Sequence, residues 1–342
     1  MCGTVGLFAD CPLAQTCAIS QLARAGSAAD PAPEPFRSPF EPWYERSAVR
    51  GAPRRVLAPV DRTQAMFSPD LVPLLQDERV RARGEDVVRR ATIHQALRYL
   101  EFTSVLEARV VNDVVRDIMF LEAGVALPQT MVRDAHRIYT DEAYHAQFSF
   151  ELAAQISELT GVQHDRSVVP YFIRRLRRIK TGLEPSLHRL VDHLFVFVSE
   201  TLITGSLSAA AQDPRVALAV RETMRDHARD EGRHHSYFAA YFARLWAALP
   251  AEVRVQIGPV VPDLIDAFLA PDVTLASVEL ASYGFDVDEA DDIIAGVVRR
   301  AHGGAGRTRM AARTLQYLRE AGADEIDSAT TARYEEMGMG RS

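Results

Sequence analysis

Apolar residues recur at three- and four-residue intervals along most of the chain after about residue 86. This spacing places apolar side chains along one face of an α-helix. Internal prolines are rare in these stretches, and Ala, Leu, Arg and Glu, which favour helices, are abundant. The pattern predicts four long helices, at about 86–123, 129–160, 184–212 and 214–248.

Residues that end or begin helices stand at the limits of these stretches. Gly124 and Gly161 follow the first and second helices, Pro128 precedes the second, and Pro214 and Pro250 flank the fourth. Glycine commonly ends a helix, and proline is tolerated only in its first turn. The sequence therefore predicts an all-α, four-helix bundle.

The segments outside the four helices differ from them in amino-acid composition. Residues 20–59 contain seven prolines, which remove backbone donors, so we expect residues 1–85 to form an irregular Pro/Ala/Arg-rich N-terminal arm with short helices. Residues 251–320 indicate additional, shorter C-terminal helices, so the domain covers 86–323. Residues 324–342 look like a polar, frayed tail.

Charge and cysteine usage narrow the class of protein. The formal net charge of −7 disfavours a nucleic-acid or anionic-membrane surface, both of which require a basic excess. Three ionisable residues, Asp192, His193 and Glu200, interrupt the most apolar stretch, 190–211, which argues against a membrane span. The cysteines, Cys2, Cys11 and Cys17, are few, and no secretory signal is evident, so we expect a cytoplasmic protein.

Two of the predicted helices carry the same pair of chemical groups. Glu142 and His145 lie at positions i and i+3 of the second helix, and Glu231 and His234 have the same spacing on the fourth. Residues three apart on a helix are separated by about 60° around its axis, so each pair can reach a common metal ion.

The other two helices each place a glutamate among apolar residues. Glu200 lies in FVFVSETLITGSL, where burial of a lone carboxylate would be costly. On the first helix Glu101 and Glu107 are rivals, because their six-residue separation prevents them from sharing a face. The spacing alone leaves this choice open.

Four-helix bundles that bind two iron or manganese ions use this arrangement, with a Glu from each of two helices and Glu-x-x-His from each of the others. Asp141 and Asp230 precede the paired glutamates and are suited to accept hydrogen bonds from ligand histidines. His227 shares a stripe of about 60° with Glu231 and is a candidate seventh ligand. We interpret His235 as a packing or supporting residue.

The ligand spacing resembles that of the p-aminobenzoate N-oxygenase (AurF-like) family of non-haem di-iron enzymes, which includes the chloramphenicol arylamine oxygenase. The resemblance extends over about residues 86–320 and selects Glu107 over Glu101. It implies a ferritin-like fold and seven metal ligands, which are Glu107, Glu142, His145, Glu200, His227, Glu231 and His234.

The resemblance also implies a reaction. Members oxidise an aryl amine to a nitro compound through hydroxylamine and nitroso stages, with O2 as co-substrate and two iron ions as cofactor. We therefore expect a small aryl amine substrate, an external electron donor or reductase, a homodimer, and a place in natural-product (antibiotic) biosynthesis.

Several further residues have less specific signals. Tyr99, Thr103, Thr204 and Ser208 lie one or two turns from Glu107 or Glu200 and are candidates to line a substrate pocket. The basic run at 174–180 is typical of a solvated or salt-bridged helix face. The HGGAGR sequence at 302–307 is interpreted as a helix-breaking turn, and Trp43 and Trp246 as packing residues.

Alternative functions use almost the same ligands. A di-iron hydroxylase or desaturase acting on carbon normally has two histidines, so His227 favours N-oxygenation. A non-catalytic ferritin-like metal-binding protein and a metal-free helical scaffold are the two further alternatives, and the ligand preferences of manganese overlap with those of iron.

Overall fold

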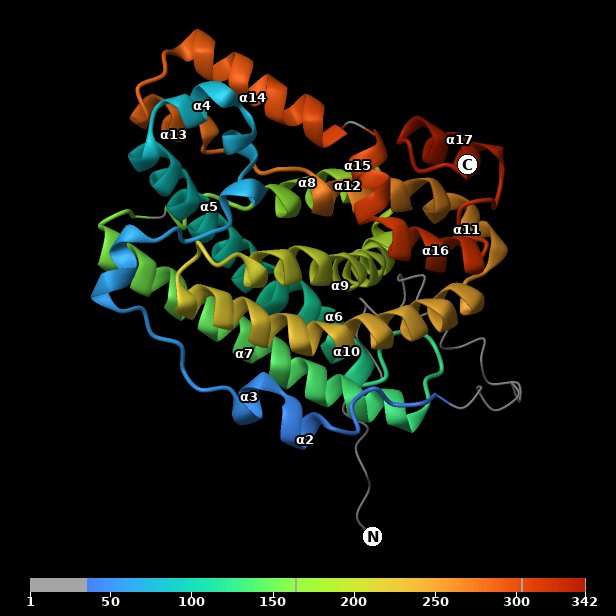
Figure 1. Cartoon of the computed structure of the whole chain (residues 1–342). Coiled ribbons are helices and arrows are strands. Elements are labelled where there is room, and N and C mark those ends of the chain that lie inside the picture. Colours follow the sequence, from blue (N-terminus) through green and yellow to red (C-terminus); the bar gives the residue numbers. More distant parts are fainter. Residues whose placement is uncertain (1–35, 164, 303, 342) are drawn as a thin grey trace.

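A computed structural model describes residues 36–163, 165–302 and 304–341 (Figure 1). Regular structure in these ranges is helical, and the one strand-like pairing among them is an isolated bridge between Ala65 and Val216. The all-α prediction is confirmed. The helices are α2 (Trp43–Arg46), α3 (Ala48–Gly51), α4 (Glu78–Ala82), α5 (Glu85–Leu106), α6 (Asn112–Met119), α7 (Gln129–Thr160), α8 (Tyr171–Thr181), α9 (His188–Gln212), α10 (Leu218–Ala248), α11 (Ala251–Ile257), α12 (Val261–Leu269), α13 (Ala276–Ser282), α14 (Val287–His302), α15 (Gly304–Met310), α16 (Ala312–Glu320) and α17 (Ser328–Glu336).

Two packed helix pairs form the bundle. The consecutive helices α5 and α6 pack along α7, and α9 packs along α10 over most of its length. Phe197 of α9 and Phe242 of α10 stack with ring centroids 4.0 Å apart, so aromatic contacts join this second pair. The four-helix prediction is therefore confirmed, with the first helix built from two consecutive α-helical segments.

The observed helix bounds agree with the predicted bounds for α7 but differ from them in the first and fourth predicted helices. Helix α7 has the predicted bounds, and Gly161 after it adopts a φ of +76°, a left-handed conformation that glycine tolerates best. The first predicted helix is not continuous, because a π-helical turn at residues 107–111 separates α5 from α6. Helix α10 begins at Leu218, after predicted residue 214, because the backbone of Arg215 and Ala217 bonds to Ala65.

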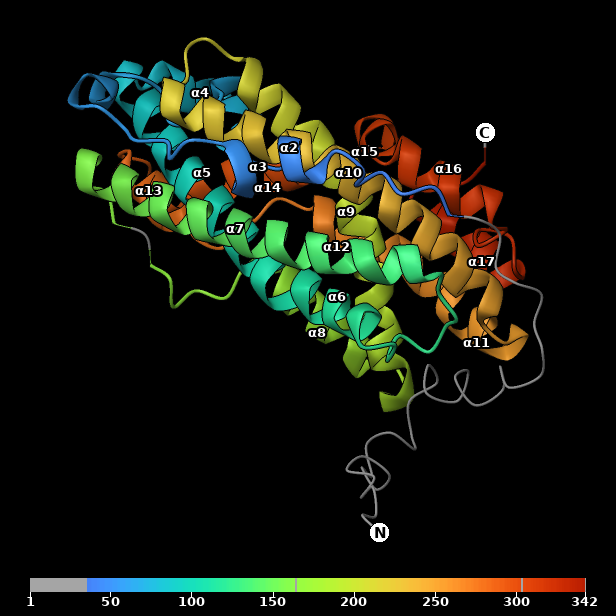
Figure 2. The same cartoon turned by 90° about the horizontal axis from the view of Figure 1, so that it is seen from below.

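The described part of the N-terminal arm contains the predicted short helices and lies along the bundle. Figure 2 shows α2 and α3 against α7 and α10. Phe40, Met66 and Leu75 are buried and belong to the same apolar core as the bundle helices. The cysteines lie outside the described residues.

The C-terminal segments correct one expectation and refine another. The tail contains α17, whose Tyr334 is 2% exposed, so it is a packed helix and not a frayed end. The segment 302–307 does break a helix, since α14 ends at His302 and α15 begins at Gly304, but residues 304–307 are helical and do not form a turn. Arg307 pairs with Asp266 of α12. The basic run lies on α8, where Arg175 also pairs with Asp266, as expected for a salt-bridged face.

None of the helices in the described ranges combines the length and the apolar character needed to cross a bilayer.

Candidate metal centre

Seven carboxylate and imidazole side chains meet at the centre of the bundle. All of them are at most 1% exposed, and they come from four different elements. They are Glu107, Glu142, His145, Glu200, His227, Glu231 and His234. The structure therefore brings together every residue of the predicted ligand set.

Local helix geometry aims these groups at one another. On α7 and α10 the i, i+3 spacing places each glutamate beside its histidine. Glu107 begins the π-helical turn after α5, and such turns are frequent at functional sites because they redirect side chains within a helix. Sequence periodicity gave no signal of this turn.

The distances define two overlapping groups around Glu231. Oε1 of Glu231 lies 3.2 Å from Nε2 of His227, 3.4 Å from Nδ1 of His145 and 3.3 Å from Nδ1 of His234. His227 Nε2 is also 2.9 Å from Oε1 of Glu107, and His234 Nδ1 is 2.7 Å from Oε1 of Glu142. Glu231 thus stands between the two ends of the cluster.

Glu200 lies at the edge of this cluster. Its Oε2 atom is 3.7 Å from Nδ1 of His234, a longer approach than that of Glu142. Two sets of four residues have potential ligand atoms within 4.8 Å of one another, Glu107 with His145, His227 and Glu231, and Glu142 with His145, Glu231 and His234. Glu200 belongs to neither set.

Many polar atoms of the cluster have no hydrogen-bond partner among the described residues. Both carboxylate oxygens of Glu107, Glu142 and Glu231 are buried in this condition. So are Nδ1 of His145, Nδ1 of His234 and Nε2 of His227. Buried polar groups are nearly always satisfied, so this concentration indicates a site for cations.

The electrostatics of the metal-free cluster agree with this interpretation. Burial raises the pKa of Glu107 to about 7 against the opposing effect of His227. Burial also lowers the pKa of His227, but Glu107 and Glu231 outweigh it and raise that pKa to about 9. Burial and the neighbouring Glu231 and Glu142 raise the pKa of Glu200 well above its usual value. The raised pKa values of Glu107 and Glu200 reflect the cost of burying negative charge, and bound cations would offset that cost.

Asp141 and Asp230 support the histidines across the helix pair. Nε2 of His145 lies 3.1 Å from Asp230, and Nε2 of His234 lies 3.3 Å from Asp141. A carboxylate can only accept, so each histidine donates through Nε2 and directs Nδ1 into the cluster. The predicted acceptor roles of both aspartates agree with these contacts.

The N-terminal arm donates hydrogen bonds to both aspartates, and sequence reasoning missed these contacts. The indole N–H of Trp43 lies 2.9 Å from both oxygens of Asp141, and Ser47 Oγ donates to the same carboxylate at 2.6 Å. The backbone N–H of Ala48 donates to Asp230 at 3.0 Å. Trp43 is thus more than the packing residue we expected. A tryptophan among prolines was the only available signal.

The rival residues lie outside the cluster. Glu101 accepts a hydrogen bond from Arg166 at 3.0 Å, which agrees with the selection of Glu107. His235 contacts the hydroxyl of Tyr317 at 3.0 Å and is a supporting residue of the core, as interpreted.

The predicted pocket residues divide into two groups. Tyr99 and Thr103 lie on α5, and their hydroxyls are buried without a partner in the described ranges. Burial, together with the charge of Glu107, raises the pKa of Tyr99. Thr204 and Ser208 lie on α9, but their side chains are outside the described structure.

A comparison with protein families identifies a family that matches this chain. The p-aminobenzoate N-oxygenase AurF family matches residues 51–322, which is most of the chain. The chain belongs to the AurF family. A comparison with curated proteins gave no significant match.

Membership explains the chemistry of the cluster. The AurF family has a ferritin-like, all-helical fold and is a family of di-iron enzymes with arylamine N-oxygenase activity in general. The residues present fit such a centre, because four buried carboxylates balance the charge of two divalent ions when the three histidines are neutral. The unpartnered oxygens and nitrogens could serve as ligand atoms for such a centre.

Proposed function

We propose that this chain is an O2-dependent di-iron N-oxygenase that converts an aryl amine to its nitro compound through hydroxylamine and nitroso stages. The observation that carries the proposal is the buried set of orphaned glutamate and histidine atoms in a chain of the AurF family. When bound, the two irons would supply the activation of O2.

The cluster residues would divide between the two ions. Glu107 and His227 face one end, Glu142 and His234 face the other, and Glu231 lies within reach of both. Glu200 is beside His234 and would complete that end. Asp141 and Asp230 keep the histidines in the tautomer that leaves Nδ1 available for the metal.

A cavity beside the cluster is the proposed substrate site. It lies between α5, α8 and α12 and is lined by Tyr99, which stands eight residues before Glu107 in sequence and whose pKa the charge of Glu107 helps to raise. Apolar walls would exclude water and orient the amine. We further propose that a separate reductase or small donor supplies electrons and that the enzyme works as a homodimer in natural-product biosynthesis.

The His227 position favours N-oxygenation over oxidation of carbon. It lies 2.9 Å from Glu107 and is as deeply buried as the other two histidines, so the cluster offers three imidazoles rather than two. A carbon hydroxylase or desaturase is the alternative that product analysis would reveal.

The test is metal stoichiometry followed by product analysis. Anaerobically loaded protein should hold about two irons per chain and, with O2 and a reductant, convert aryl amines to nitro compounds identified by mass. The variant His227→Ala should lose N-oxygenation, whereas the control His235→Ala, at a neighbouring histidine bonded to Tyr317, should retain it. Two irons with a carbon-oxidised product would favour the hydroxylase alternative. A load of many irons would indicate a storage protein, and no bound iron would refute the proposal.

A further inference from the structure

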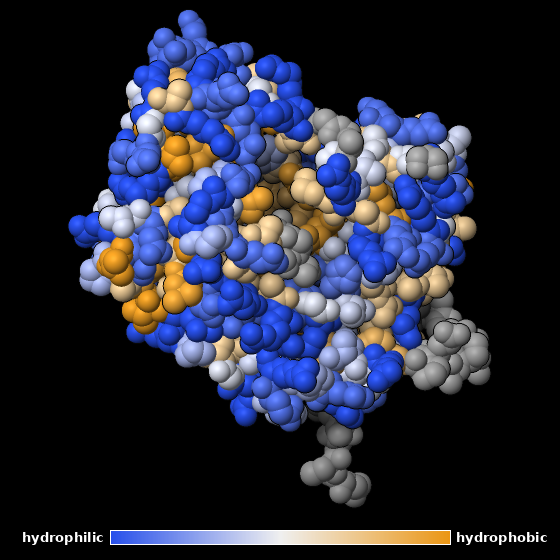
Figure 3. All heavy atoms as spheres, in the orientation of Figure 1, coloured by the Kyte–Doolittle hydropathy of each residue, from blue (hydrophilic) through white to orange (hydrophobic). Residues whose placement is uncertain are grey.

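The cavity beside the metal cluster has a volume of about 240 Å³. This is slightly below the range of about 300–1,000 Å³ usual for small-molecule sites, so it fits a substrate built on a single ring. Figure 3 shows a hollow with apolar side chains near the middle of this face.

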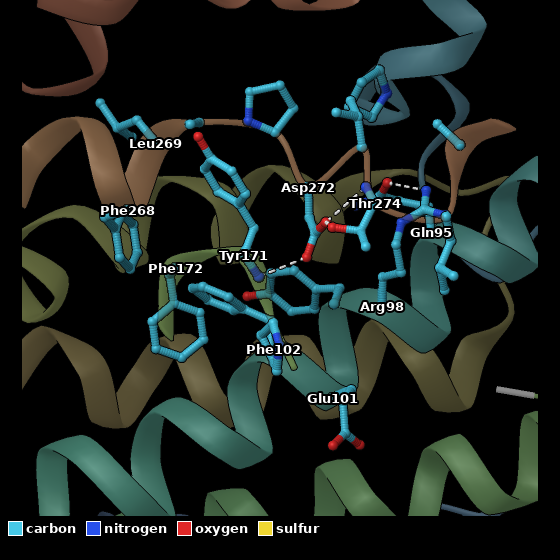
Figure 4. A pocket seen from close by; sticks show the side chains of 18 of the residues that line it. Gln95, Arg98, Glu101, Phe102, Tyr171, Phe172, Phe268, Leu269, Asp272 and Thr274 are labelled. Carbon is cyan, nitrogen blue, oxygen red and sulfur yellow. Dashed lines mark hydrogen bonds between the residues drawn. The ribbon is translucent and has the colours of Figure 1, made fainter. Parts of the chain in front are cut away.

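Aromatic rings form one part of the cavity wall. Figure 4 shows Phe102, Tyr171, Phe172 and Phe268 gathered around the cavity. The ring of Phe102 packs edge-on against Phe172 at 4.9 Å and against Phe268 at 5.6 Å between centroids. A flat aromatic ring is the shape that such a wall accepts best.

The only cation among the lining residues is Arg98, and its charge is already neutralised. Arg98 forms an ion pair with Glu279, and the two side chains are 12% and 8% exposed. A second guanidinium nitrogen donates to the side chain of Gln95 at 2.9 Å. A substrate carboxylate would have to compete with Glu279 for this guanidinium.

The remaining charged groups of the wall are acidic and also paired. Glu101 is bound to Arg166, which lies outside the lining. Asp272 accepts hydrogen bonds from the backbone N–H groups of Tyr171 at 2.8 Å and Thr274 at 3.0 Å. Neither acid offers a positive partner to a carboxylate brought into the cavity.

We propose that the substrate is an aryl amine without an acidic substituent, and that the Arg98–Glu279 ion pair is the element that excludes carboxylates. This inference rests on the proposed function and narrows its substrate class. Displacing Glu279 from Arg98 would leave a buried carboxylate unpaired, and such a charge is strongly unfavourable. A neutral ring needs no such exchange.

Two near-isosteric probes test the proposal, 4-aminobenzoate, which is an anion, and 4-aminobenzamide, which is neutral. Their dissociation constants would be measured by calorimetry on the iron-loaded full chain without O2, so that no turnover occurs. The amide should bind about 10-fold or more tightly than the benzoate. Equal affinities, or tighter benzoate binding, would overturn the proposal.

The variant Glu279→Gln tests the role of the ion pair. It leaves the Arg98 guanidinium unneutralised, so the preference for the amide should fall about 10-fold or reverse. Glu101→Gln is the matched control, because it removes a carboxylate from the same wall without releasing Arg98, and its preference should stay close to that of the parent chain. An unchanged preference in Glu279→Gln would refute the role of the pair.

A second variant tests the proposal in case Glu279→Gln does not fold. The double change Arg98→Gln with Glu279→Gln removes both charges and should bind the benzoate with the same weak affinity as the parent chain, because the paired Arg98 does not bind the carboxylate there. Loss of benzoate binding in the double variant would show that Arg98 serves carboxylates and would overturn the proposal. Correct selectivity without any N-oxygenation in air with a reductant would refute the proposed function alone, whereas N-oxygenation of the benzoate in preference to the amide would refute this inference alone.

Discussion

His145 on α7 donates through Nε2 to Asp230 on α10, with 3.1 Å between the two atoms. The reverse contact joins His234 on α10 to Asp141 on α7 at 3.3 Å. Each aspartate directly precedes a cluster glutamate on its own helix but supports a histidine on the other. The two helices therefore position each other's ligand groups.

Removing either aspartate should weaken metal binding. The variants Asp141→Ala and Asp230→Ala are expected to lower iron affinity about 10- to 100-fold, because the histidine loses the acceptor that fixes its ring. Affinity would be measured by competition with a chelator under anaerobic conditions. Asp226→Ala is the control, since Asp226 is buried on α10 but binds Arg55. Unchanged affinity in both variants would remove the assigned role.

The reciprocal contacts show what the sequence could and could not predict. The adjacency of Asp141 to Glu142, and of Asp230 to Glu231, was enough to identify the acceptors. Their partners depend on how α7 and α10 pack, which no pattern within one helix contains. The same holds for Trp43, which lies 98 positions before Asp141 in sequence.

The bundle itself was predictable because its signal is local and repeated. Apolar periodicity and the flanking Gly161 gave the bounds of α7. The π-helical turn at Glu107 has no comparable signal, since its residues continue the helical pattern of α5. The packing of the arm on the bundle was also not predicted. A high density of prolines indicates that a segment lacks regular secondary structure, but it does not indicate whether the segment packs against the rest of the protein.

The contact of the arm with Asp141 should contribute to stability. Trp43→Phe removes the indole N–H that donates at 2.9 Å, and should lower the free energy of unfolding by about 1–2 kcal/mol through the lost bond to a charged acceptor. Tyr44→Phe is the control, because Tyr44 is 60% exposed and its change should cost less than about 0.5 kcal/mol. Chemical denaturation measures both. Equal effects would mean that the hydrogen bond contributes nothing specific.

A buried histidine away from the metal cluster should make stability depend on pH. His193 on α9 lies 2.6 Å from the hydroxyl of Tyr241 and 3.1 Å from Asp117. Burial, assisted by Arg189, lowers its pKa although Asp117 and Asp192 oppose the shift. The unfolded chain, with a histidine pKa of about 6.5, therefore binds more protons than the folded chain at mildly acidic pH.

The expected result is a loss of stability as the pH falls below about 6.5. His193→Gln retains a donor and an acceptor but does not titrate, so its stability should fall less between pH 7.5 and about 5.5. Both chains are measured without metal. All other titrating groups are then the same in the parent chain and in His193→Gln, so the difference between their stability curves reports on His193. Parallel stability curves would contradict the assignment.

Metal loading should stabilise the fold through Glu231. Its Oε1 atom contacts all three cluster histidines, and ions that bind only the folded chain stabilise it by about 4 kcal/mol when free ion exceeds the dissociation constant 1,000-fold. Fe(II) added without O2 should therefore raise the unfolding temperature, and a chelator should reverse the change. Glu231→Gln should lose most of this increase, because both groups of potential ligands contain Glu231. Glu151→Gln, which changes a glutamate of α7 that pairs with Arg54, should keep it. An increase of the same size in Glu231→Gln would mean that the stabilising ion binds elsewhere.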